Sequence, residues 1–170
     1  MYWWLWLIPI AGTLVFLWFL RKGPPHWRHV ETSRLQTLVS QFVRKPVTGS
    51  VMVLEREQTA GVLQLTLRTN DRGGHDLEFG IPDVDWSSES FDMLYASFRD
   101  AGYDVSLEQS GRCARVRRFL RASTSCGAPS LADAGMHCIE VAAGALGWGP
   151  ETTYTVHCER RRRNQTIPAT

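Results

Sequence analysis

The feature that most restricts the fold of this chain is an uncharged run near its start. The run extends over 19 residues, from Tyr2 to Leu20, and Thr13 is its most polar side chain. As an α-helix it would be roughly 28 Å long, about the thickness of the hydrocarbon layer of a bilayer. The run therefore predicts a transmembrane helix, and residues 1–22 are expected to form a membrane anchor.

Other structures for this run fit the residues less well. A cleavable signal peptide would begin with basic residues and end with small ones, whereas here Arg21 and Lys22 follow the apolar run. A buried helix of a globular domain would be amphipathic or shorter, and a helix lying in the membrane interface needs a polar face. A spanning helix is the structure that the pattern favours.

Large aromatic side chains are concentrated in the predicted anchor. Tryptophans near both ends are typical of the two membrane interfaces, and a proline inside the run predicts a bend. The residues expected to anchor the helix or to pack against other helices are Trp3, Trp4, Trp6, Pro9, Phe16, Trp18 and Phe19.

Basic residues follow the predicted anchor and none precede it. Arg21, Lys22 and Arg28 are expected to remain on the cytoplasmic side, near lipid headgroups. This predicts a single-pass membrane protein with its N-terminus outside and its globular domain in the cytoplasm. If the chain is bacterial, the membrane is the inner one.

The remaining residues are enough for one small domain. Residues 23–32 are expected to be a linker, 33–163 a globular α+β domain and 164–170 a polar tail. The 19 Lys and Arg nearly balance the 17 Asp and Glu, which excludes a strongly basic, histone-like binder and an acidic tail protein.

Hydrophobic periodicity predicts three helices and six strands in this domain. In chain order they are a helix over 33–44, strands over 51–56, 63–68 and 77–81, a helix over 88–101, strands over 103–107 and 113–122, a helix over 131–146 and a strand over 154–158. Ser87 and Ser130 are expected to cap the second and third helices, and Gly102 to end the second. The third helix is rich in Ala and Gly, so it should lie close to the sheet.

The order of these elements suggests a fold. From Leu77 onward it is strand, helix, strand, strand, helix, strand, which is the order of a ferredoxin-like (βαββαβ) sandwich. The predicted fold is therefore a ferredoxin-like sandwich behind one transmembrane helix, with an extra N-terminal β-hairpin and short helix. A mixed sheet with another strand order is the alternative.

The four cysteines do not show the spacing of a metal site. Cys113, Cys126, Cys138 and Cys158 are separated by 12, 11 and 19 residues, and structural zinc sites usually contain a pair two to four residues apart. Buried thiols are the favoured interpretation for Cys138 and Cys158. Disulfides would apply if the domain lay outside the cell, and a metal site is the third possibility. No metal and no cofactor is predicted.

Arginines gather in two places near the end of the chain. Nucleic-acid binding is not expected, because the first run contains Phe119 as its single aromatic. The arginines either pair with acidic residues of the same domain, such as Glu108 and Glu159, or contact anionic lipid or an acidic protein surface. The residues of this predicted patch are Arg115, Arg117, Arg160, Arg161, Arg162 and Arg163.

Candidate catalytic residues are few. His75, Asp83 and Asp85 could bind a cation or act as acid and base, although aspartates in loops more often satisfy backbone donors. The sequence contains no nucleophile elbow, zinc-protease motif, dinucleotide fingerprint or phosphate loop. The chain is not expected to be an enzyme.

These observations predict a non-catalytic accessory subunit of a larger membrane protein complex, of the respiratory or light-harvesting type for example. Its partners would be the lipid bilayer and other membrane subunits. The alternatives are a membrane-tethered sensor or ligand-binding module, in which His75, Asp83 and Asp85 would line a concave site, and an enzyme acting on a membrane-associated substrate.

Overall fold

The computed structural model describes residues 26–109, 118–123 and 130–159, and these residues form seven strands and three α-helices. The strands are β1 (His26–Glu31), β2 (Val51–Arg56), β3 (Val62–Thr69), β4 (His75–Pro82), β5 (Asp104–Gln109), β6 (Arg118–Ser123) and β7 (Thr153–Glu159). The helices are α2 (Thr32–Val43), α3 (Phe91–Asp100) and α4 (Leu131–Ala145), with a short 3-10 helix, η2 (Ser88–Ser90), before α3.

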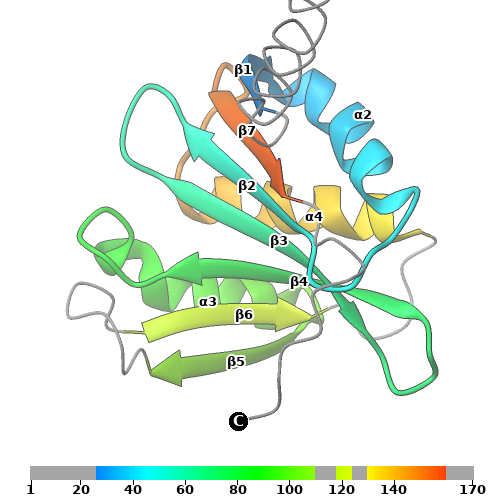
Figure 1. The fold of residues 1–170 in the computed structure, drawn as a ribbon. Coiled ribbons are helices and arrows are strands. Elements are labelled where there is room, and N and C mark those ends of the chain that lie inside the picture. The colour runs from blue at the N-terminus through cyan, green and yellow to red at the C-terminus, as the bar shows by residue number, and fades with distance from the viewer. Residues whose placement is uncertain (1–25, 110–117, 124–129, 160–170) are drawn as a thin grey trace, which may run out of the picture.

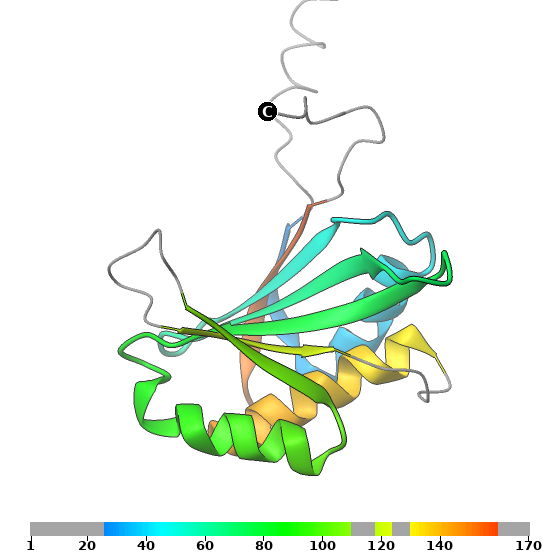
Figure 2. The same cartoon turned by 90° about the horizontal axis from the view of Figure 1, so that it is seen from below.

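The seven strands form one antiparallel sheet in the order β1-β7-β2-β3-β4-β6-β5. All three α-helices lie against the same side of the sheet, so the domain has two layers (Figures 1 and 2). The other side of the sheet, called the open face below, is covered by no helix among the described residues.

The core lies between the sheet and the helices. Strand residues that alternate with polar ones supply most of it, as expected for a sheet with one buried side. The fully buried strand residues are Met52, Leu54, Leu63, Leu65, Leu67, Leu77, Phe79, Ile81, Leu120, Ala122 and Val156. The helices contribute the stripes Leu35–Val39–Phe42 and Phe91–Leu94–Phe98, together with the small residues of α4.

The prediction of a ferredoxin-like sandwich is wrong. That fold would place the first and last strands of its motif, β4 and β7, side by side. In the structure the hairpin β2–β3 lies between them, and β7 pairs with β2 and β1. The hairpin is central rather than an addition, because its leucines are fully buried in the core of the domain. The alternative, a mixed sheet, is not found either, since every adjacent pair of strands is antiparallel.

Helix α4 lies close to the sheet, and Gly135 permits the approach. A Cβ atom at Gly135 would lie 2.9 Å from a methyl carbon of Leu77 and 2.9 Å from one of Val39. Contacts this short are repulsive, so a larger residue would push α4 away from β4 and α2. The small residues of the sequence therefore set the distance between the two layers.

Residues His26–Glu31, which the sequence assigned to the linker, form strand β1 and pair with β7. Trp27 pairs with Val156 and Val30 with Tyr154, so β1 advances three residues while β7 advances two. This is a β-bulge, and His29 within it has a positive φ of 53°. The bulge interrupts the alternation that would reveal a strand in the sequence.

The predicted helix ends are partly confirmed. Ser130 caps α4 by accepting a hydrogen bond from the Asp133 backbone N–H at 3.1 Å, and Gly102 follows α3 with a φ of 84°. Ser87 does not cap α3: its hydroxyl donates to the Pro82 carbonyl at 2.6 Å and accepts from the Val84 N–H at 3.1 Å. The residue before α3 is Ser90, whose side chain makes no capping bond.

No helix in residues 26–109, 118–123 and 130–159 is long and apolar enough to cross a membrane. The longest, α4, has 15 residues, or about 22 Å, against a hydrocarbon layer of about 30 Å. The run from Tyr2 to Leu20 lies outside the described residues. The predictions of a transmembrane helix, a single-pass membrane protein and a cytoplasmic domain are therefore withdrawn.

Candidate functional site

The open face carries the side chains that alternate with the core residues. The strand register arranges them in rows that run across the sheet. One row crosses six strands as Glu159, Val51, Thr66, Glu78, Ser123 and Asp104. The next row consists of His157, Val53, Gln64, Gly80, Arg121 and Ser106. Polar groups from distant parts of the chain thus become neighbours.

A trough of about 550 Å³ lies in the middle of this face. Its lining residues are Gly49, Val51, Gln64, Thr66, Arg68, Glu78, Pro82, Glu108, Gln109, Phe119 and Arg121. Gly80 forms part of the floor of the sheet here, and a Cβ atom at this position would collide with the ring of Phe119. The absence of a side chain at Gly80 therefore lets Phe119 lie flat across β4, where it supplies an aromatic surface in an otherwise polar region.

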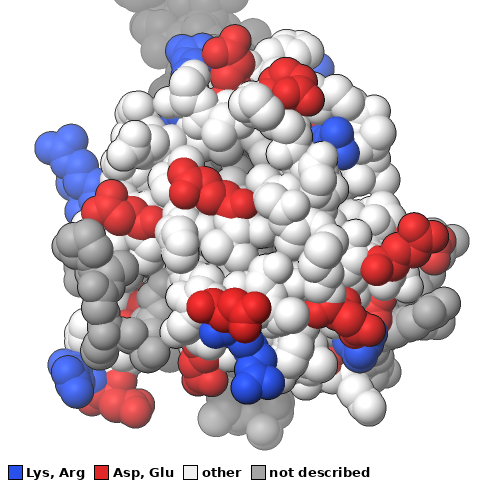
Figure 3. Space-filling model, turned by 180° about the vertical axis from the view of Figure 1, so that it is seen from behind, with Lys and Arg blue, Asp and Glu red and all other residues white. Residues whose placement is uncertain are grey.

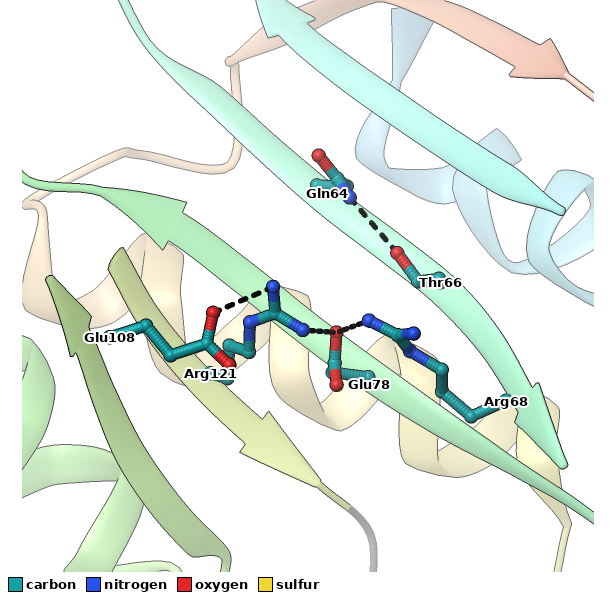
Figure 4. A network of polar contacts seen from close by, with 6 residues as sticks. All are labelled: Gln64, Thr66, Arg68, Glu78, Glu108 and Arg121. Carbon is teal, nitrogen blue, oxygen red and sulfur yellow. Dashed lines mark hydrogen bonds and ion pairs between the residues drawn. The ribbon is translucent and has the colours of Figure 1, made fainter. Parts of the chain in front are cut away.

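The charged groups of the trough form one network (Figure 4). The Glu78 carboxylate accepts from Arg68 at 3.1 Å and from Arg121 at 3.0 Å, and the other end of the Arg121 guanidinium reaches Glu108 at 2.9 Å. Beside them, the Gln64 amide donates to the Thr66 hydroxyl at 3.0 Å. Both arginines are thus held and neutralised by carboxylates.

The open face has a surplus of negative charge. Its acidic residues in the described part of the chain are Glu31, Glu55, Glu57, Asp76, Glu78, Asp104, Glu108 and Glu159. Against these eight carboxylates stand two guanidiniums, Arg68 and Arg121. Acidic groups are also spread over the helix-covered side (Figure 3).

The described residues as a whole are acidic, although the chain is not. They contain all 17 Asp and Glu of the sequence but 10 of its 19 Lys and Arg, which gives a net charge of −7. The complete chain has a net charge of +2. The domain will therefore attract cationic groups, most strongly where carboxylates gather on the open face.

Glu57, directly after β2, ties the β1 bulge to β7. Its carboxylate accepts from the His29 backbone N–H at 2.9 Å, from Thr155 at 2.8 Å and from Thr153 at 3.1 Å, and it contacts the His29 ring at 2.8 Å. These interactions, the His29 backbone bond first, lower the pKa of the Glu57 carboxyl to about 2. The ionised form is therefore the one that the fold stabilises.

Replacing Glu57 by glutamine should flatten the acid dependence of stability. Because the folded pKa lies below the ordinary value of 4.5, Glu57 stabilises the fold above pH 4.5, and this contribution is lost as the pH falls towards about 2. Urea unfolding of wild type and Glu57→Gln at several pH values across that window measures the difference. Glu55→Gln, which changes an exposed carboxylate near the end of β2, is the control. Parallel pH profiles for wild type and Glu57→Gln would contradict the assignment.

The structure does not bring the predicted catalytic candidates together. His75 is the first residue of β4 and Asp83 follows its last, so they lie at opposite ends of an eight-residue strand, about 25 Å apart. Asp83 is 2% exposed and accepts from Arg118 at 2.8 Å. Asp85 is exposed. The concave cluster that a sensor or an enzyme would have needed at these residues is not formed.

The two cysteines within the described residues are buried, Cys138 in α4 and Cys158 in β7. Burial raises the pKa of the Cys138 thiol to about 12, so it is protonated at neutral pH. Burial likewise raises the pKa of the neighbouring Tyr103, whose hydroxyl lies 2.5 Å from Nδ1 of His137. No group of His, Cys, Asp and Glu side chains in the described ranges could hold a metal ion. Cys113 and Cys126 lie outside these ranges.

Among the residues predicted to contact lipid, other helices or an acidic partner, Arg28 is the one within the described ranges, and it lies in β1. The other predicted site residues are outside the described ranges, namely the aromatic residues, Pro9, Arg21 and Lys22 of the N-terminal segment and the arginines at 115, 117 and 160–163. The interpretation of the last six as a patch for an acidic partner stays a prediction. Of the trough residues, the sequence analysis named Phe119 and Glu108, and Glu108 pairs with Arg121 as an acidic partner of the arginines. The other trough residues were not singled out.

Comparison with protein-family models, with curated proteins and with solved structures gave no match to this chain. The site therefore has to be interpreted from its own geometry and charge.

Proposed function

We propose that this chain is a non-catalytic accessory subunit of a larger protein assembly, and that its open face binds a cationic, extended segment of a partner protein. The observation that carries the proposal is the surplus of carboxylates on that face, eight against two guanidiniums among the described residues. Lysine and arginine side chains complement such a surface and are steered to it by long-range attraction.

The dimensions of the open face suit a short polypeptide segment. Glu159 and Asp104 mark the two ends of the row that crosses the trough, five inter-strand spacings apart. At about 4.8 Å per spacing the row is about 24 Å long, which an extended segment of about seven residues would span. Basic side chains at its ends would meet Glu159 and Asp104, and its middle would lie over Phe119, Gln64 and Thr66.

The ion pairs inside the trough keep its own arginines from repelling a basic segment. Arg68 and Arg121 are bound by Glu78 and Glu108, so they present little net positive charge to an approaching cation. The Arg121 guanidinium also lies over the ring of Phe119, at 5.7 Å from its centroid, which further holds it within the trough. The trough can therefore accept a basic segment without the removal of its own arginines.

The test is the affinity of the full-length chain for a labelled seven-residue peptide of alternating arginine and serine, measured by fluorescence anisotropy. The triple variant Glu55→Gln/Asp104→Asn/Glu159→Gln should bind about tenfold more weakly, since three exposed ion pairs of about 0.5 kcal/mol each sum to about 1.5 kcal/mol, and 1.4 kcal/mol is tenfold. Added salt should weaken binding to wild type, because these charges are exposed.

A matched variant distinguishes binding at the open face from non-specific attraction of the peptide to a negatively charged protein. Glu89→Gln/Asp100→Asn/Glu140→Gln removes the same charge from exposed residues of the helical layer, and it should bind the peptide as wild type does. Equal loss in both triple variants would refute a site on the open face. Binding that requires replacement of Arg160–Arg163 by glutamine would show that the chain's own basic run occupies the face, and the separate partner would be abandoned.

A ligand-binding module is the second candidate, favoured by the volume of the trough. About 550 Å³ is within the range of small-molecule sites. A neutral ligand held by Gln64, Thr66 and Phe119 would bind with little dependence on salt, and the triple variant of the open face would leave its affinity unchanged. The triple variant and added salt therefore distinguish the two candidates, because both should weaken the binding of a basic peptide and leave the binding of a neutral ligand unchanged.

A further inference from the structure

A second groove is lined by residues of strand β1 and helix α2. Strand β1 is at the edge of the sheet farthest from β5, and Figure 1 shows α2 following it. The volume of the groove is about 480 Å³. The lining residues are Trp27, Arg28, Val30, Ser33, Arg34, Thr37, Leu38 and Gln41. Those from α2 form a stripe beside the buried stripe of that helix, so the groove runs along the helix.

The groove is basic, in contrast to the rest of the domain. Two arginines line it, Arg28 and Arg34, and no carboxylate does. Neither arginine forms an ion pair with another described residue. The nearby carboxylate of Glu31 accepts from the Ser33 hydroxyl at 3.4 Å. Residues 26–159 have a net charge of −4, so this groove differs from the rest of the domain in favouring an anionic group.

The start of α2 adds to this preference. Its N-cap residue, Glu31, makes no side-chain capping bond, and the first turn contains no acidic residue. The first N–H groups of a helix carry partial positive charge and lack partners within the helix. Arg34 lies in that same turn, so Arg28, Arg34 and the first N–H groups of α2 together outweigh the single carboxylate of Glu31, and this end of the groove favours an anion.

Strand β1 offers a backbone edge along the groove. It is the last strand of the sheet and pairs on one side only, with β7, among the described residues. A strand edge next to a helix is a known geometry for binding extended peptides, in which backbone hydrogen bonds give affinity and alternate side chains enter the groove. Trp27, 37% exposed, and Leu38 provide the apolar contacts for such side chains.

We infer that the groove between β1 and α2 binds an extended acidic segment of a partner polypeptide, which adds as a strand to the edge of β1. Acidic side chains of the segment meet Arg28, Arg34 and the start of α2, and apolar ones contact Trp27 and Leu38. This surface is distinct from the open face and prefers the opposite charge. The domain would thus join two partner segments, one basic and one acidic.

The probe is a labelled eight-residue peptide with the order Glu-Thr-Val-Thr, repeated once, because this order directs alternating acidic and apolar side chains to one side of a strand. The full-length chain should bind it, and Arg28→Gln/Arg34→Gln should lower the affinity about tenfold or more, as expected for the loss of charged hydrogen bonds. The control Arg72→Gln/Arg99→Gln removes the same charge from exposed residues outside the groove, and it should bind as wild type does.

A second peptide tests the strand geometry. Replacing its threonines by proline removes backbone donors while keeping the acidic and valine residues, and this peptide should lose most of its affinity. Equal loss in the two arginine double variants, equal binding of the proline peptide, or no binding of the first peptide at millimolar concentration would each overturn the inference. Unchanged unfolding midpoints of both double variants confirm that the comparison concerns binding. The arginine-serine peptide should bind all of these variants equally, which separates this test from that of the open face.

Discussion

Phe79→Ala should destabilise the domain by about 3–5 kcal/mol, the range for removing a fully buried phenylalanine. Phe79 lies in the interior strand β4, is inaccessible to solvent, and stacks on Phe98 of α3 with ring centroids 4.9 Å apart. Its loss leaves a cavity between the sheet and α3, which the surrounding leucines can fill only in part. Urea unfolding followed by tryptophan fluorescence measures the change in the free energy of unfolding.

Phe119→Ala is the matched control for this substitution. Phe119 belongs to the neighbouring strand β6 but is half-buried on the open face, where water can replace the ring. Its removal should cost about 1–2 kcal/mol, and it should also weaken any binding that uses the trough. Losses of equal size for the two variants would mean that the open face is as closely packed as the core, contrary to the structure.

Arg118→Met should cost about 2–4 kcal/mol, because it leaves the carboxylate of Asp83 buried without its cation. Asp83 is 2% exposed, its Oδ2 accepts from Arg118 at 2.8 Å, and its Oδ1 has no hydrogen-bond partner among the described residues. Breaking a buried pair from one side is strongly destabilising. The cost is below the upper limit of that range, since the Arg118 side chain is 41% exposed.

The double variant Asp83→Asn/Arg118→Met distinguishes this cause from lost packing. Arg118 also lies over the ring of Phe91 at 4.7 Å, and methionine retains a contact with that ring. If the unpaired charge is the cause, the added Asp83→Asn should restore at least half of the lost stability in the same urea experiment. A double variant no more stable than Arg118→Met would assign the loss to packing instead.

Local structure was predictable from the sequence where one physical signal acted alone. The alternation of Leu63, Leu65 and Leu67 with polar residues predicted a strand with one buried side, and the structure confirms it. Ser130 was predicted as a helix cap because a serine hydroxyl at the start of a helix can accept a hydrogen bond from a free backbone N–H in the first turn. Ser87 has the same chemistry, but its hydroxyl is occupied by the backbone at Pro82 and Val84. Tertiary structure decides between such equal local signals.

Strand order could not be predicted because it depends on contacts between distant residues. The pairing of Met52 with Cys158 places β7 beside β2, across more than a hundred residues. No local pattern distinguishes this from a ferredoxin-like arrangement. Strand β1 was missed for a different reason: Val30 is its one buried residue, and the bulge at His29 removes the period of two.

The candidate site was hidden for the same reason as the strand order. Gln64, Thr66 and Arg68 could be assigned to the solvent side of a strand from alternation, and Glu78 to the same side of another. Their association with Arg121 and Glu108 needs β6 to lie beside β4, which the structure alone reveals. A count of charges along the chain would have shown that all acidic residues lie between the two basic ends, because such a count does not depend on which strands pair.

The two basic ends of the chain determine the sign of its net charge, and therefore how strongly copies of the protein repel one another. Residues 1–25 and 160–170 hold six basic side chains and no acidic one, so a chain without them would carry a net charge of −4 instead of +2. The intact protein and residues 26–159 alone would therefore move in opposite directions in an electric field at neutral pH. Near-neutral proteins associate more readily than highly charged ones, so the basic ends would lower the mutual repulsion that keeps copies of the acidic core apart.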